Sequence, residues 1–257
     1  MRFFFILIIS GVIVSNLFSQ GKSIGDQYII VGARGAVNST WLLNQNQLHD
    51  KGIKYKATWG GTGGIMLGFH YTEWGSVNVE ALYSTFNQKL SSGIDSMKWT
   101  SSTKLAYLEF PILLHFDTKN FKYVEGGIKI SSLLSASGTY NSSQTSLLNY
   151  SGKDIKNNFE SSNLSLVFGW GGAIWGSGGL LIHGGIRFTY GLSDILTTYG
   201  GKGSDYMPLA DGVSAKPKPY AKTNTASVGF IISADYDLGW FMSNSCNRKY
   251  KFFLFNR

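Results

Sequence analysis

The sequence predicts an all-β protein, an eight-stranded antiparallel transmembrane β-barrel of up-and-down topology with short periplasmic turns and long extracellular loops. Three observations predict it. Apolar residues alternate strictly with other residues, which gives each strand one apolar face. The connections are long and short in turn, as a membrane barrel requires. After the N-terminus no apolar run is long enough for a helical span. The alternating segments are Tyr28–Ala36, Gly63–Tyr71, Ser76–Leu90, Thr103–Asp117, Phe121–Ala136, Ser161–Trp175, Gly179–Leu196 and Thr223–Leu238.

The alternation is clearest in the fourth segment. Every second residue there is apolar and is expected to face lipid: Ala106, Leu108, Phe110, Ile112, Leu114 and Phe116. Lipid offers no hydrogen bonds to a free strand edge, so a sheet of such strands must close into a barrel. The alternative is a soluble lipocalin-like barrel, in which the apolar face of each strand points inward and the outer face is charged.

The same alternation points charged side chains into the barrel. Three cations and four anions are predicted to face the lumen: Arg34, Glu80, Glu109, Glu125, Lys129, Arg187 and Asp235. An eight-stranded interior has room for side chains but little for water, and an unpaired buried charge costs several kcal/mol. We therefore predict an interlocked salt-bridge plug, with an ion path as the alternative. Three histidines share the inward positions: His70, His115 and His183.

Two smaller features concern how the strands are built. The triplet Gly-Gly-Ile begins at Gly63, Gly126 and Gly184, and its inward glycines are expected to leave space for a neighbouring Tyr or Arg to lie across the lumen. Pro111 removes a backbone donor, and a closed barrel has no edge strand to accommodate it. We expect a bulge or a frayed periplasmic end at that position.

Aromatic residues gather near the ends of the segments, as membrane interfaces favour. Seven are predicted to be interface residues: Tyr71, Trp74, Trp170, Trp175, Tyr190, Tyr236 and Trp240. The stretches 37–57, 91–102, 137–160 and 197–222 are rich in Ser, Asn, Gly and Lys. They are expected to be mobile extracellular loops, which leaves both termini in the periplasm.

The N-terminus predicts the compartment. Met1 and Arg2 precede about a dozen apolar residues, the length of a signal-peptide core and shorter than a membrane span of ~20 residues. We expect residues 1–19 to be a signal peptide, 20–240 the outer-membrane barrel, and 241–257 a tail. An uncleaved anchor is the alternative. The single cysteine, Cys246, lies in the tail, so no internal disulfide holds the fold.

These properties favour a non-enzymatic barrel of the Gram-negative outer membrane, acting as a structural or partner-binding component. Its expected partners are outer-membrane lipid and proteins reached through the extracellular loops or the periplasmic face. Neither a cofactor, a metal nor a nucleic acid is expected. A narrow pore for ions or small solutes is the first alternative. The second is a lipid hydrolase using Ser233 and His183, although no acid is placed by spacing to orient the histidine.

Particular segments resemble a known family. These are the signal-peptide end Phe18-Ser19-Gln20, the stretch Tyr107–Leu114 (YLEFPILL) and the Gly-Gly-Ile strand that follows it. Together they resemble the PorT-type outer-membrane β-barrel proteins (porin family) of Bacteroidetes, in which an acidic residue stands two positions before a proline. The resemblance implies an eight-stranded outer-membrane barrel, some members of which are linked to secretion or gliding machinery. The tail after Trp240 departs from the common pattern, in which the last strand ends on an aromatic residue.

Overall fold

The computed structural model describes residues 27–72, 74–92, 98–118, 122–143, 149–177, 179–203 and 219–242, with only the backbone for Ser92 and residues 239–242. Its long strands are β1 (Gln27–Asn44), β3 (Trp59–Thr72), β4 (Gly75–Ser92), β5 (Trp99–Asp117), β6 (Lys122–Ser142), β8 (Ser162–Ser177), β9 (Leu180–Gly191) and β10 (Thr223–Met242). The short elements are α2 (Gln45–Leu48), β2 (Ile53–Lys56), β7 (Tyr150–Asp154) and the 3-10 turn η2 (Lys156–Asn158). None of the helices in these ranges is long and apolar enough to cross a membrane.

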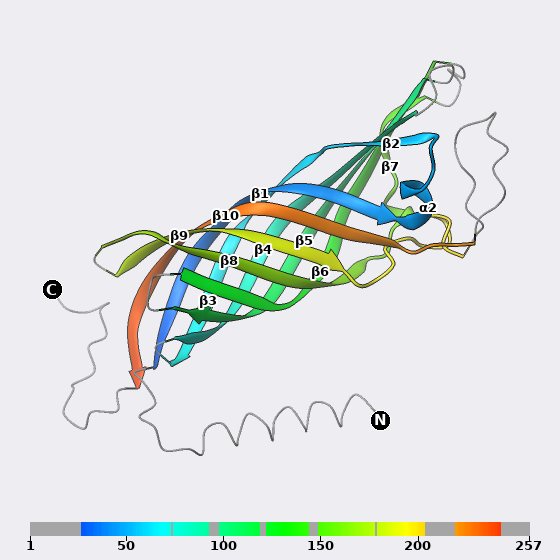
Figure 1. The fold of residues 1–257 in the computed structure, drawn as a ribbon. Coiled ribbons are helices and arrows are strands. Elements are labelled where there is room, and N and C mark those ends of the chain that lie inside the picture. Colours follow the sequence, from blue (N-terminus) through cyan, green and yellow to red (C-terminus); the bar gives the residue numbers. More distant parts are fainter. Residues whose placement is uncertain are drawn as a thin grey trace, which may run out of the picture.

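The long strands form a closed antiparallel ring (Figure 1). Each pairs with its neighbour along the chain, β1 pairs with β10 to close the circle, and β4 pairs with β5. The eight long strands of the described ranges therefore make an up-and-down barrel, which confirms the predicted fold class. One end carries the short connections after β3, β5 and β8 and is called the turn end. The opposite end is called the loop end.

The two faces of the wall differ as the alternation predicts. Outward positions carry exposed apolar side chains, such as Ile65, Phe230 and Ile232. Inward positions are buried, and many of them carry polar or charged side chains, as at Glu80 and Thr225. A lipocalin-like barrel would show the reverse, with an apolar interior and a charged exterior. The soluble alternative is therefore contradicted by the side chains that line this wall.

The expected loops contain more structure than the sequence analysis assigned. Residues 37–44 continue β1, and β2 lies within the expected loop 37–57. β5 begins at Trp99 and β6 continues to Ser142, where β7 pairs with it. We call the projecting part of β4, β5 and β6, with β2 and β7 at its edges, the loop-end sheet (Figure 1). It forms because backbone pairing continues beyond the point where β3 and β8 end.

The last long connection is fixed at both of its described ends. Tyr220 donates a hydrogen bond to Asp194, and the backbone N–H of Thr223 donates to the same carboxylate at 3.2 Å. Burial and then the bond to Asp194 raise the pKa of the Tyr220 hydroxyl. These partly buried contacts hold Tyr220 and Thr223 against Asp194, and the mobility of 197–222 stays a prediction.

Pro111 does not cause the predicted bulge. It lies opposite Lys129 within β5, and the strand continues to Asp117. The pairing of β4 with β5 has the same register on both sides of the proline but is interrupted there. A missing N–H therefore removes bonds from the ladder without inserting a residue. The bulge of β5 against β6 lies instead between Ala106 and Tyr107.

Inward glycines make room for one large ring. A Cβ placed on Gly185 would overlap the Tyr123 hydroxyl, and one on Gly171 would lie 2.8 Å from the Tyr123 ring. Tyr123 of β6 therefore lies over Gly171 of the adjacent strand β8 and Gly185 of β9. The space above Gly185 is the kind that the sequence analysis expects of the Gly-Gly-Ile triplet. The Tyr123 ring stacks on His115, with the ring centroids 4.6 Å apart.

Candidate functional site: an ion-pair network across the lumen

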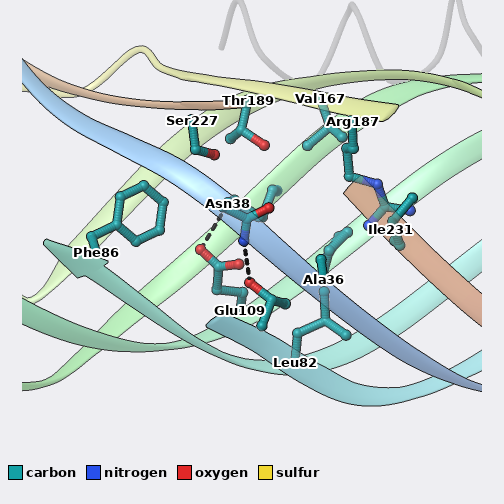
Figure 2. Close-up of a pocket in the computed structure, with 13 residues that line it drawn as sticks. Ala36, Asn38, Leu82, Phe86, Glu109, Val167, Arg187, Thr189, Ser227 and Ile231 are labelled. Atoms are coloured by element: carbon teal, nitrogen blue, oxygen red, sulfur yellow. Dashed lines mark hydrogen bonds and ion pairs between the residues drawn. The ribbon is translucent and has the colours of Figure 1, made fainter. Parts of the chain in front are cut away.

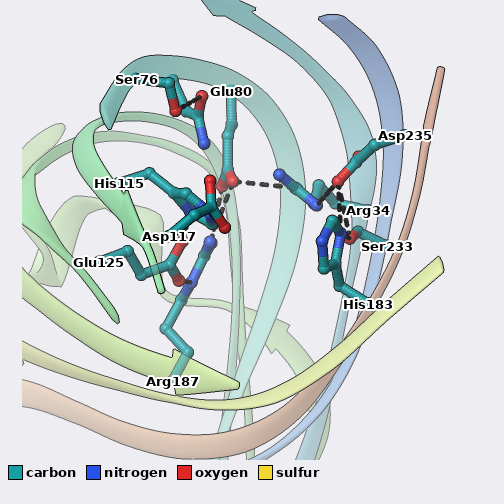
Figure 3. A network of polar contacts seen from close by, with 11 residues as sticks. Arg34, Ser76, Glu80, His115, Asp117, Glu125, His183, Arg187, Ser233 and Asp235 are labelled. Atoms are coloured by element: carbon teal, nitrogen blue, oxygen red, sulfur yellow. Dashed lines mark hydrogen bonds and ion pairs between the residues drawn. The ribbon is translucent and has the colours of Figure 1, made fainter. Parts of the chain in front are cut away.

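A cluster of charged side chains lies across the lumen near its middle (Figure 3). Its centre is Glu80 of β4, a fully buried carboxylate. Arg187 of β9 donates to both Glu80 oxygens, at 2.6 and 2.9 Å, and Arg34 of β1 donates through Nε at 3.2 Å. Because β4 and β9 are fourth neighbours in both directions round the ring, the pair Arg187–Glu80 spans the lumen along a diameter.

Both guanidinium groups have a second carboxylate partner. Arg34 Nη1 lies 3.1 Å from each oxygen of Asp235 on β10. Arg187 Nε donates to Glu125 Oε1 of β6 at 2.7 Å. The chain Asp235–Arg34–Glu80–Arg187–Glu125 thus joins five of the eight barrel strands. Alternating charge at these distances satisfies groups that would otherwise be costly to bury.

A separate pair lies closer to the loop end. Lys129 Nζ of β6 donates to Glu109 Oε1 of β5 at 2.6 Å, and the Lys129 ammonium lies 5.4 Å from the centre of the Phe86 ring. Ser84 donates to the other Glu109 oxygen at 2.7 Å, and Ser131 lies 3.4 Å from Oε1. The structure thus places all seven predicted lumen charges inside the barrel, each beside an opposite charge.

The space left between these side chains is small at mid-lumen. The cavity there has a volume of about 30 Å³, with Glu109, Lys129 and Arg187 among its walls (Figure 2). Such a volume holds one or two water molecules. A larger cavity of about 460 Å³ lies at the turn end, bordered by His70, His115 and the inner side of the network. Of these two cavities in the described part of the chain, the wider one lies at the turn end.

The histidines lie at this turn-end cavity but do not make a catalytic relay. His183 Nδ1 is 3.0 Å from Asp235 Oδ2 and 3.5 Å from Ser233 Oγ, so the acid and the hydroxyl share one ring nitrogen. A serine hydrolase instead needs the acid on one nitrogen and the serine on the other. Ser233 itself donates to Asp235 at 3.1 Å. In the described ranges, no three His, Cys, Asp or Glu side chains are placed to hold a metal ion.

The predicted interface aromatics with described side chains take outward positions. Trp74 is exposed and stacks on Phe116, with centroids 5.9 Å apart. Trp170 lies within β8 rather than at its end and stacks on Phe188. The other predicted interface aromatics with described side chains are Tyr71, Trp175, Tyr190 and Tyr236. The Trp240 side chain lies outside the described residues.

Sequence reasoning missed several partners of these groups. Ser84 and Ser131 bind Glu109, but serines occur at many inward positions, so neither stands out. Trp59 was also missed, although it is 63 % exposed at the loop-end limit of β3. An aromatic residue directly before Gly60 and Gly61 was the signal in the sequence that could have marked Trp59 as the start of β3.

Comparison with known proteins fits this architecture. The model of the outer membrane protein beta-barrel domain family matches residues 18–197. The chain belongs to this family. Membership places this barrel in the outer membrane, with its apolar wall against lipid.

Several solved outer-membrane proteins resemble this chain at low sequence identity and low TM-score. Neisserial surface protein A is 13 % identical with a TM-score of 0.36, over 80 % of this chain and 95 % of that one. OprG of Pseudomonas aeruginosa is 13 % identical with a TM-score of 0.37, over 83 % and 96 %. Ail of Yersinia pestis is 10 % identical with a TM-score of 0.36, over 83 % and 99 %. A search of curated proteins found no match.

Proposed function

We propose that this protein is a sealed, non-enzymatic outer-membrane barrel that serves as a structural or partner-binding component of a surface machine. The observation that carries the proposal is the diametric pair Arg187–Glu80 within a network of opposite charges. A conducting lumen needs a continuous water path, whereas this one is crossed by ion pairs at mid-height. The charges act as a plug and not as selectivity groups.

A second seal at the loop end supports the same proposal. A buried apolar cluster closes the lumen there, and Ile155 and Phe159 of the connection after β7 pack against it. Its members are Leu42, Phe86, Leu105, Tyr107, Leu133, Ala136 and Ile195. A hydrophobic constriction of this kind excludes water and ions. An ion would have to pass this seal and the charged plug in series.

The loop-end sheet supports the partner-binding part of the proposal. β2 pairs on one side with β4, and β7 pairs on one side with β6. Within the described residues the other edge of each short strand has no strand partner. An open strand edge is a template for adding a strand of another chain. We propose that this end faces outward from the cell and that both termini lie in the periplasm.

The finer assignment to PorT-type barrels of Bacteroidetes belongs to the same proposal. The stretch that carries that resemblance, Leu108–Leu114, lies in β5, and its acidic residue Glu109 holds Lys129. A role beside secretion or gliding machinery follows from the same resemblance. Export through a signal peptide at residues 1–19 is proposed from the basic start and the short apolar run of the N-terminus. The N-terminal 26 residues lie outside the described part of the chain.

Single-channel conductance tests the seal. The chain from residue 20 is refolded, checked for the heat-dependent gel shift of a closed barrel, and inserted into a planar bilayer. We expect a folded barrel without discrete current steps. Reproducible steps from the wild-type chain would overturn the plug and favour the narrow pore. The variant Glu80→Ala/Arg187→Ala removes the diametric pair and serves as the comparison for a loosened lumen.

Photo-crosslinking in cells tests partner binding. A photoreactive amino acid replaces Ser151, on β7 of the loop-end sheet. The matched control replaces Ile65, which is 67 % exposed on the lipid-facing wall. We expect a discrete protein adduct from position 151 and none from position 65. The absence of any adduct at 151 and at Tyr55 of β2, in a folded barrel, would contradict the partner-binding proposal.

A further inference from the structure

Four exposed lysines lie on one face of the loop-end sheet. Lys54 and Lys56 belong to β2, Lys89 to β4 and Lys104 to β5. Lys56 stands directly opposite Lys89, and Lys104 stands directly opposite Asn87. Residues opposite each other, and residues two apart on one strand, project from the same side of a sheet. The four side chains therefore share one surface, which we call the lysine face.

The lysine face continues the lipid-facing wall. On β5 the alternation that carries Lys104 leads to Leu108 and Phe110, which point outward. On β4 the alternation that carries Lys89 leads to Tyr83, which is 52 % exposed. The lysines thus lie on the loop-end side of the last large apolar outward residues of these two strands, Tyr83 on β4 and Leu108 on β5. At this height a membrane protein meets lipid headgroups rather than acyl chains.

An aromatic residue marks the boundary between the two zones. Trp59 projects outward at the start of β3, and its carbonyl accepts a hydrogen bond from the Asn87 side chain. Asn87 in turn stands opposite Lys104, so the tryptophan and the first lysine lie in one row across the sheet. Lys56 and Lys89 occupy the next row away from the barrel. Tryptophan at the headgroup level with lysine beyond it is the usual order at an interface.

The charges on this face are not neutralised by the described acids. Neither Lys54, Lys56, Lys89 nor Lys104 forms an ion pair with a described carboxylate. Asp154 of β7 lies in the row of Lys104, two strands away, and its carboxylate accepts from the backbone N–H of Lys156. Like charges directly opposite each other, as at Lys56 and Lys89, destabilise a sheet unless an anion separates them.

We infer that the lysine face is a docking surface for lipid-linked phosphate groups in the leaflet around the loop end. Two ammonium groups on adjacent strands, about 5 Å apart at their Cβ atoms, can contact one phosphate together. The inference deepens the proposed function, since an outward-facing loop end makes the occupant a phosphorylated glycolipid of the outer leaflet. The ligand follows from the position of the lysines beside the acyl-chain zone, which free anions do not share.

Native mass spectrometry of the detergent-solubilised barrel tests the inference, with lipid A as the probe. The test variant is Lys54→Gln/Lys56→Gln/Lys89→Gln/Lys104→Gln. The control variant loses the same charge elsewhere at the loop end, as Lys51→Gln/Lys153→Gln/Lys156→Gln/Lys222→Gln. Each lysine beside a charged headgroup strengthens binding severalfold, so we expect the test variant to retain at least roughly tenfold less lipid A and the control to stay within about twofold of wild type.

Three results would overturn the inference. Equal retention of lipid A by the test variant would show that the lysine face does not bind it. Equal losses in both variants would show attraction by net charge alone. Inorganic phosphate that competes as well as lipid A at equal concentration would show a site for free anions. A variant that replaces the same four lysines with arginine is expected to keep binding, which separates lost charge from a damaged fold.

The outcome is distinguishable from a failure of the proposed function. The sealed lumen is measured by conductance, and the lysine face lies outside the barrel wall. A silent barrel that does not retain lipid A would remove this inference and leave the seal in place. A conducting barrel that retains lipid A would overturn the sealed lumen and leave the lysine face as a lipid-binding surface.

Discussion

Arg187 and Glu80 join opposite walls of the barrel through two hydrogen bonds of 2.6 and 2.9 Å. Three strands lie between β4 and β9 in either direction, so no other described ion pair covers a longer path round the ring. Glu80 also accepts from Arg34, and it therefore lies between two guanidinium groups. This position makes one carboxylate the centre of the network.

Replacing that carboxylate is expected to destabilise the barrel. Glu80→Gln leaves Arg34 and Arg187 facing a neutral amide, and removing one partner of a buried ion pair costs about 3–5 kcal/mol. The urea midpoint of unfolding in lipid vesicles is expected to fall. Glu160→Gln is the matched control, since Glu160 pairs with Lys202 at the exposed loop end, where solvent screens the pair and its loss is expected to change stability little. Equal midpoints for the two variants would contradict a central role for Glu80.

The second ion pair allows a test of pairing itself. Lys129→Met leaves the Glu109 carboxylate buried without its cation, and we expect a loss of about 3–5 kcal/mol. The double variant Lys129→Met/Glu109→Gln removes both charges and is expected to recover much of that loss. Ser84 would still donate to the amide oxygen at position 109, and the amide nitrogen would face the Ser131 hydroxyl, which can accept. If the double variant were less stable than the single one, the Lys129–Glu109 pair would stabilise the barrel by more than the mutual neutralisation of two buried charges.

Substitution of Tyr107 is expected to stabilise the barrel rather than destabilise it. Its side chain is fully buried, its ring meets Phe86 edge-on at 5.7 Å, and its hydroxyl has no hydrogen-bond partner in the described residues. Tyr107→Phe removes an unsatisfied buried group and is expected to raise the free energy of unfolding by about 1 kcal/mol. Ser84→Ala is the contrasting variant, because its hydroxyl donates to Glu109. A destabilised Tyr107→Phe would indicate a partner outside the described ranges.

Alternation alone was enough to predict which side chains enter the lumen. Charges at inward positions such as Glu109 and Lys129 are easy to read, because a period of two assigns each residue to one face. Their pairing across the barrel was not readable. Whether Arg187 meets Glu80 or Glu109 depends on the stagger of the strands round the ring, and stagger is a property of closure that no single strand encodes.

The loop-end strands show where the pattern becomes too short. Ile53-Lys54-Tyr55-Lys56 alternates like a strand, but four residues are only the shortest length at which alternation indicates one. β7 (Tyr150–Asp154) has only exposed side chains, so neither face carries an apolar signal. Such strands form by extending a neighbour's backbone pairing, which depends on tertiary context and not on their own residues.

The room left by inward glycines gives the last prediction. A Cβ on Gly185 would lie 2.7 Å from the Trp170 carbonyl oxygen, which belongs to backbone and cannot move freely, and it would overlap the Tyr123 hydroxyl. We expect Gly185→Ala to destabilise the barrel by about 1–3 kcal/mol through overpacking. Gly35 points outward with nothing within 4 Å of its added Cβ, so Gly35→Ala is the matched control and should be neutral or slightly stabilising. The urea midpoints of both variants are compared in the same vesicles. A shift at Gly35 as large as at Gly185 would mean that strand conformation, and not the Tyr123 ring, sets the requirement for glycine.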